Sequence, residues 1–219
     1  MEARLGALAD FYGPLALPPR DLFAFFVSAV VSARTLPARR DLAWQALKRL
    51  PALTPDAMFR ASKADLKAAL EVLGGGDDRL DALKTGSGHF RRHRALPDVV
   101  SGPLSGAVRA LCDVPHLTPA SRLRALLFAG RHALGGTDDA VSRVVARLDG
   151  GPAAGGPLRR RFARRRLLAD LGPEPDRLGR PVVLLAHHAA HACLDHAPHC
   201  GVCPLAASCA HPPARGGVS

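Results

Sequence analysis

An all-α fold is predicted by three features of this 219-residue sequence. Apolar residues recur at helical spacing, alternating runs of β-branched residues are scarce, and capping residues precede most of the apolar segments. Hydrophobic residues make up 47% of the chain, which is enough to bury the core of one domain or of two small ones. We therefore expect short helices joined by short loops in a compact bundle.

The first helices are indicated by capping residues that stand directly before apolar segments. Asp21 precedes the apolar run 22–31, which is too short to span a bilayer and is expected to form a buried helix. Asp41 precedes a segment whose apolar positions suit a core-facing stripe, so we expect a helix to begin there. Thr54 and Ser62 are the expected caps of the next two helices.

The second half of the chain continues the helical pattern. Residues 78–94 read as a helical stretch that Gly86-Ser87-Gly88 interrupts. Thr118-Pro119 is typical of a helix start, and the helix is expected to run from Ala120 to Leu134. Further helices are expected at residues 104–111, at 158–171 and from Pro181 to Ala192.

The chain is strongly basic, with 30 Lys and Arg against 19 Asp and Glu and a formal net charge of +11. This excess favours a polyanionic partner such as nucleic acid, although a general preference for arginine in the genome would produce it too. The arginine-rich segment 158–171 is most simply a solvated helix face, with a duplex backbone as the alternative partner. No membrane anchor or export leader is recognisable, and a reducing bacterial cytoplasm is the expected location.

Four of the five cysteines lie near the C-terminus as C-x6-C-x2-C-x5-C, namely Cys193, Cys200, Cys203 and Cys209. Thiolates this close in sequence suit a metal centre, and only one C-x2-C pair is present where a zinc ribbon has two. Four-thiolate ligation of an iron–sulfur cluster is the favoured interpretation. The alternative is a mixed zinc site that includes the neighbouring histidines His188, His191, His196 and His199. A disulfide framework is disfavoured because Cys112 would remain unpaired.

This cysteine spacing resembles the [4Fe-4S] loop of the endonuclease III family of helix-hairpin-helix DNA glycosylases. The resemblance implies an all-α fold with a six-helix barrel lobe at 22–134 and a cluster lobe made of 1–21 with 135–219. The cluster loop would span residues 193–209. It also implies that the chain acts at the bacterial nucleoid on double-stranded DNA containing damaged bases, and we expect a monomer.

The segment V-P-H-L-T-P-A-S-R at 114–122 resembles the family's hairpin in part. His116 and Thr118 stand at the two glycine positions, and Ala120 stands where lyase-competent relatives have a lysine. In the family the hairpin binds a DNA phosphate, and the end of an early helix faces the DNA. The resulting candidates for DNA contacts are Arg34, His116, Thr118, Ser121 and Arg122.

The segment G-G-T-D-D-A-V-S-R-V resembles the family's catalytic segment and aligns Asp138 with the essential aspartate. A carboxylate there would stabilise positive charge on the sugar as the base leaves and would orient the attacking water. The simpler interpretation of Asp138 is an N-cap. Because Ala120 replaces the lysine, we expect a monofunctional glycosylase with little or no AP-lyase activity. The alternative is a degenerate iron–sulfur protein that binds lesions without cutting them.

Overall fold

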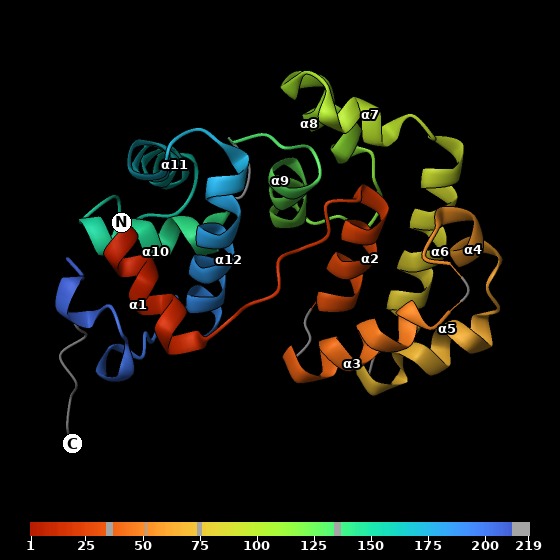
Figure 1. The fold of residues 1–219 in the computed structure, drawn as a ribbon, viewed down its shortest axis with the longest axis horizontal. Helices are drawn as coiled ribbons and strands as arrows, with labels where there is room; N and C mark the ends of the chain where they lie inside the picture. Colours follow the sequence, from red (N-terminus) through yellow and green to blue (C-terminus); the bar gives the residue numbers. More distant parts are fainter. Residues whose placement is uncertain (34–36, 51, 74–75, 134–136, 212–219) are drawn as a thin grey trace. The chain divides into compact units, whose positions relative to one another are not determined.

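The computed structural model describes residues 1–33, 37–50, 52–73, 76–133 and 137–211. Over these ranges the chain is helical and contains no β-strand, so the prediction of an all-α fold is confirmed. The chain divides into two compact units, one made of residues 1–17 with 131–219 and the other of residues 18–130 (Figure 1). Among the described residues, no helix has the length and apolar character needed to cross a membrane.

The unit formed by residues 18–130 surrounds the apolar helix α2 (Leu22–Ser32), which contacts α3, α6 and α9. Its core contains Phe26, Leu47, Leu66 and Leu83, all with 0% exposure. The other helices of this unit are α3 (Pro37–Lys48), α4 (Pro55–Arg60), α5 (Lys63–Leu70), a 3-10 turn at Glu71–Leu73, α6 (Gly76–Arg92), α7 (Leu96–Ser101), α8 (Leu104–Cys112) and α9 (Pro119–Phe128).

The unit formed by residues 1–17 and 131–219 joins the two ends of the chain. Its helices are α1 (Glu2–Tyr12), α10 (Asp139–Asp149), α11 (Pro157–Leu171) and α12 (Pro175–His191), followed by 3-10 turns at Cys200–Val202 and Ala206–Ser208. Helix α10 packs against both α11 and α12, and α1 packs against α12 (Figure 1). This packing brings the first helix of the chain beside the helix that leads into the cysteine segment.

The helix starts predicted from capping residues are confirmed at four positions. The side chain of Asp21 accepts a hydrogen bond from the Ala24 amide at 2.7 Å, and Thr54 accepts one from the Ala57 amide at 3.2 Å. Ser62 and Thr118 cap α5 and α9 in the same way. Each of these caps satisfies one backbone donor that the first helical turn would otherwise leave unpaired.

Two other predicted helix starts are wrong. Helix α3 begins at Pro37, so Asp41 lies inside the helix and is not its cap. Helix α12 begins at Pro175, well before the predicted start at Pro181. Proline is well suited to the first helical turn, and an internal proline removes only one backbone donor, so Pro181 does not stop α12.

The end of α9 also differs from the prediction. The helix ends at Phe128, where the amides of Ala129 and Gly130 both bond to the Ala125 carbonyl, and it does not continue to Leu134. Arg131 then adopts a φ of 56° and turns the chain out of the helical path. This turn coincides with the boundary between the two units.

Helix α6 is continuous through Gly86-Ser87-Gly88, so the expected interruption is wrong. Gly86 lies against the ring of Phe26, and a Cβ at this position would come closer than 3 Å to three ring atoms. The buried Ser87 hydroxyl donates to the Leu83 carbonyl at 2.6 Å, one turn earlier. The glycine therefore permits close packing of α6 on α2 and does not break the helix.

We expect Gly86→Ala to destabilise the protein by about 1–3 kcal/mol, because the added methyl group would overpack the contact with Phe26. The measurement is the midpoint of urea unfolding. Gly106→Ala in α8 is the matched control, since a Cβ there meets nothing within 4 Å, and it should be neutral or stabilising. Equal unfolding midpoints for the two variants would show that the contact between Gly86 and Phe26 has room for an added methyl group.

Candidate functional site

The turn between α8 and α9 places two of the predicted DNA-contacting side chains at the surface. Val114 and Leu117 are buried at 0% and 3% exposure and hold the turn to the core, whereas His116 and Thr118 are exposed. His116 has a φ of 61°, in the left-handed region that favours glycine. The turn thus keeps a glycine-like backbone at a position where the sequence has histidine.

Thr118 organises the first turn of α9. Its hydroxyl oxygen accepts from the Ser121 amide at 3.1 Å and lies 3.0 Å from the Ser121 hydroxyl. The next residue, Arg122, is half-buried, and its Nε has no hydrogen-bond partner within the described part of the chain. Hydroxyls, a guanidinium and the amides of a helix N-terminus together form a surface suited to an anion.

The structure thus brings His116, Thr118, Ser121 and Arg122 together on one turn and the helix that follows it. Ala120 lies half-buried in the same helical turn and offers no amine. Arg34, the remaining predicted DNA contact, lies outside the residues that the structure describes.

Asp138 is the N-cap of α10 and is buried, with 3% exposure. Its Oδ1 accepts from the Val141 amide at 2.9 Å. The adjacent Asp139 forms an ion pair of 2.9 Å with Arg160 of α11. The capping interpretation is therefore confirmed, and the catalytic role of this unusually buried cap stays a prediction.

Two arginines on the polar face of α10 hold the cysteine segment. Arg143 donates to the carbonyls of Cys193 at 3.0 Å and Ala189 at 3.1 Å. Arg147 donates to the carbonyls of Leu194 at 2.5 Å and Asp195 at 2.7 Å, and its Nη1 lies 3.4 Å from the Cys193 sulfur. Sequence reasoning missed Arg147, although its i,i+4 spacing from Arg143 places both side chains on one helix face.

The four predicted metal ligands lie in one half-buried segment, and their thiols influence one another. Burial raises the pKa of Cys203, and the nearby Cys193, Cys209 and Cys200 raise it further. Within the described ranges, no three His, Cys, Asp or Glu side chains are grouped so that they could hold a single metal ion. Four-thiolate ligation of a cluster and the mixed zinc site therefore both stay predictions from the cysteine spacing and the chemistry of thiolate ligands.

His188 connects this segment to α1. It has 2% exposure, its Nδ1 lies 2.9 Å from the Tyr12 hydroxyl, and its Nε2 lies 3.6 Å from the Cys203 sulfur. Burial, with a smaller effect of His187, lowers the pKa of His188 to about 4, so the ring is neutral at pH 7. A neutral imidazole has one N–H, and when Tyr12 donates to Nδ1 that N–H faces the sulfur.

Tyr12 had no signal in the sequence, because 176 residues separate it from His188. The other predicted zinc candidates are placed differently. His191 makes a 2.8 Å contact with the His187 carbonyl, and His196 and His199 are exposed.

A double-mutant cycle tests the contact between Tyr12 and His188. We expect Tyr12→Phe to cost about 1–3 kcal/mol of unfolding free energy, because it leaves a buried imidazole nitrogen without its partner. In a His188→Leu background the same change should cost much less, since the nitrogen is already gone. Guanidinium unfolding of the four proteins measures the coupling, and strictly additive costs would show that this hydrogen bond does not form.

No protein-family model and no curated protein matches this sequence. Solved structures with a similar fold include an endonuclease III trapped in a covalent intermediate with DNA, at 17% identity and a TM-score of 0.61, with 95% of this chain and 93% of that chain covered. A thermostable thymine-DNA glycosylase matches at 14% identity and a TM-score of 0.63, covering 96% and 95%. A DNA-3-methyladenine glycosidase from Bacillus halodurans matches at 16% identity and a TM-score of 0.57, covering 87% and 86%. The chain therefore has the all-α fold of the helix-hairpin-helix DNA glycosylases.

Proposed function

We propose that this protein is a DNA glycosylase of base-excision repair that releases a damaged base from double-stranded DNA by hydrolysis of the N-glycosidic bond. The observation that carries the proposal is Asp138, a buried carboxylate at the start of α10 in the fold shared with the DNA glycosylases. An exposed cap would serve the helix equally well, so its burial favours a role in chemistry.

The proposed reaction breaks the bond between the sugar C1′ and the base nitrogen, and the base leaves with the bonding electrons. Positive charge develops on the sugar, and the Asp138 carboxylate stabilises it. A water then bonds to C1′ and loses its proton towards Asp138. The Val141 amide occupies Oδ1 and fixes the orientation of the carboxylate, while the N-terminus of α10 stabilises its negative charge.

Binding is assigned to the turn between α8 and α9. In this proposal His116, Thr118, Ser121 and Arg122 contact the DNA backbone, and Arg34 contacts the DNA near the extruded nucleotide. The N-terminus of α9 supplies additional donors for a phosphate. Proline at position 119 removes one donor, so we expect a weaker phosphate contact than a glycine hairpin makes.

We propose that the enzyme is monofunctional, since the hairpin carries no lysine and three of the four lysines of the chain make structural contacts. Lys84 donates to the carbonyls of Met58, Phe59 and Ala61 at the end of α4. Lys48 lies over the Trp44 ring, and Lys67 pairs with Asp77. Ala120 cannot form the Schiff base that strand cleavage by a lyase requires.

We also propose that Cys193, Cys200, Cys203 and Cys209 hold a [4Fe-4S] cluster. When bound, the cluster would cross-link the C-terminal segment and so supply a structural tie. Arg143 and Arg147 hold the backbone that leads into this segment, and His188 Nε2 lies 3.6 Å from the Cys203 sulfur, where it can donate when Tyr12 donates to Nδ1. Hydrogen bonds of this kind stabilise the charge on ligating thiolates.

The compact units support a proposed assignment of lobes. In this proposal residues 22–134 form the six-helix barrel lobe with the hairpin, and 1–21 with 135–219 form the cluster lobe, whereas the compact units divide at 17/18 and 130/131. We propose that the protein acts as a monomer on nucleoid DNA in a bacterial cytoplasm.

We expect the native protein to release a base from at least one lesion in a panel of duplex oligonucleotides, and Asp138→Asn to reduce the rate on the order of 100-fold or more. The asparagine keeps an oxygen for the Val141 amide, so the thermal midpoint should change little. Asp21→Asn is the matched control, because Asp21 caps α2 with the same hydrogen bond but lies at an exposed position. Its rate should equal that of the native protein.

The same assay distinguishes the alternative functions. The abasic product strand should remain intact, and borohydride should trap no covalent adduct. An adduct would overturn the monofunctional assignment. If DNA binds but no lesion in the panel loses its base, the protein is instead a lesion-binding protein, which the replacement of the hairpin glycines and lysine would then explain.

We expect anaerobically purified protein to contain about four iron and four sulfide per chain and to absorb broadly in the visible range, as four-thiolate ligation implies. Cys203→Ser should lose most of this iron. The control is Cys112→Ser, which changes an exposed cysteine at the end of α8 and should keep it. Zinc in place of iron and sulfide would contradict the cluster assignment.

A further inference from the structure

Helix α11 contains arginines that form ion pairs and others that do not. Arg160 pairs with Asp139 at 2.9 Å, and Arg166 pairs with Asp149 at 3.0 Å. The other three exposed or half-buried arginines form no ion pair with any described residue, and these are Arg161, Arg164 and Arg165. We call these three the α11 arginine face.

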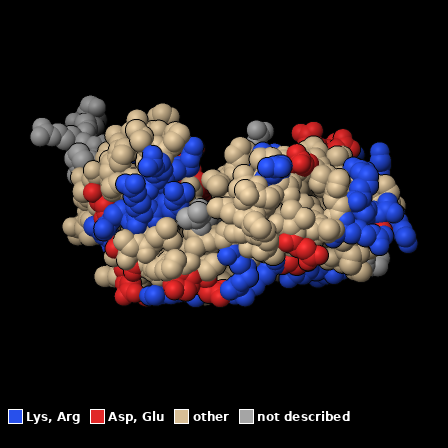
Figure 2. All heavy atoms as spheres, turned by 90° about the horizontal axis from the view of Figure 1, so that it is seen from above, with Lys and Arg blue, Asp and Glu red and all other residues tan. Residues whose placement is uncertain are grey.

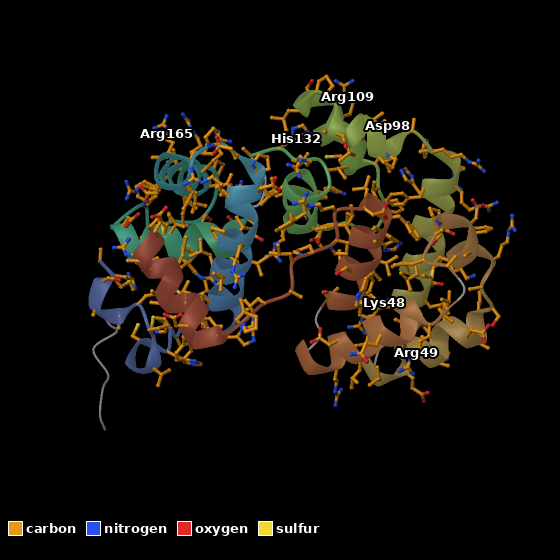
Figure 3. All side chains as sticks on the ribbon, in the orientation of Figure 1. Lys48, Arg49, Asp98, Arg109, His132 and Arg165 are labelled. Carbon is orange, nitrogen blue, oxygen red and sulfur yellow. The ribbon has the colours of Figure 1, made fainter. Side chains whose placement is uncertain are left out.

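The helical period explains how the face arises. Arg159, Ala163, Leu167 and Leu171 recur at every fourth position and are buried against the unit. The α11 arginine face has i, i+3, i+4 spacing. Arg161 and Arg165 are exposed on the side turned away from this buried stripe, and half-buried Arg164 lies at its edge beside Leu167. Figure 2 shows Lys and Arg side chains gathered over this helix, and Figure 3 shows Arg165 on its outer side.

This arrangement is unfavourable without a partner. Like charges at i,i+3 and i,i+4 destabilise a helix, and nearby carboxylates do not offset these three. The face also lacks the broad outward apolar surface of a membrane-bound helix, because only Leu158 is a strongly exposed large apolar residue on α11, at 69%. A regular polyanion fits it better than a lipid surface does.

The α11 arginine face lies near the proposed catalytic carboxylate within the same unit. Arg160, one residue before the face, bonds to Asp139, the neighbour of Asp138. Arg164 and Thr137 line the same shallow hollow beside the segment that leads into α10. A strand whose sugar reached Asp138 would therefore bring flanking phosphates towards Arg164.

We propose that the α11 arginine face binds phosphates of duplex DNA beside the nucleotide that reaches Asp138. Arg161 and Arg165 are about 6 Å apart along the α11 axis, which is similar to the rise of about 7 Å that two phosphate steps of one strand make along the duplex axis. This inference rests on the proposed function only in taking DNA as the ligand, and it assigns to α11 a contact separate from the hairpin.

The test is the salt dependence of binding to a lesion-containing duplex, measured by fluorescence anisotropy. The full-length variant Arg161→Gln/Arg164→Gln/Arg165→Gln should show a slope of log K against log salt that is shallower by about 2–3, since each lost phosphate contact contributes about 0.9. The corresponding Arg→Lys triple variant keeps the charge and should keep the native slope.

The control triple variant is Arg49→Gln/Arg60→Gln/Arg94→Gln, which removes the same charge from exposed positions of the other unit. Its slope should stay near the native value. An unchanged slope for the α11 glutamine variant, or an equal change in the control, would overturn the proposal. The proposal would also be overturned if the α11 glutamine variant lost binding to phosphatidylserine vesicles while its DNA binding stayed unchanged.

Binding and base release fail separately. A shallower slope together with no base release would keep the α11 contact and reject the glycosylase. If Asp138→Asn abolished base release and the α11 variant had an unchanged slope, the glycosylase would be kept and the α11 contact rejected. Native protein that binds no duplex at low salt would reject both.

Discussion

Arg143 and Arg147 link the cysteine segment to the helix that Asp138 caps. Both lie on α10 and donate to backbone carbonyls of the cysteine segment, while Asp138 caps the other end of the same helix. A helix is stiff over this length, so the position of the carboxylate and the path of the cysteine segment depend on one another. Damage to the cysteine segment would therefore be transmitted to α10 and its cap.

The parts of the fold that local chemistry determines could be predicted from the sequence. Caps such as Asp21 and Thr118 act within one helical turn, and the α2 segment is so apolar that any compact fold of the chain would bury it. The errors occurred where tertiary contacts override local preference. Gly86 is read as a helix breaker until Phe26 is known to lie against it, and α9 ends early at the boundary between the units.

The candidate site divides in the same way. The cysteine spacing and Asp138 could be predicted because each belongs to a short sequence motif. The contact from Tyr12 to His188 joins the two ends of the chain and leaves no local pattern. The turn before α9 is intermediate. Its departure from a glycine hairpin is visible in the sequence, but the left-handed backbone of His116 is visible only in the structure.

The way α10 holds the cysteine segment has a consequence for how this sequence can change. The arginines contact mainly main-chain oxygens, which every residue type provides, and their side-chain partner between Cys193 and Cys200 is Asp195, 4.0 Å from Arg143. Apart from Asp195, the residues of this stretch can therefore change in charge and size without loss of a contact to these two arginines. The stretch L-D-H-A-P-H, which contains no Lys or Arg, is thus compatible with the same support from α10 that a more basic stretch would receive.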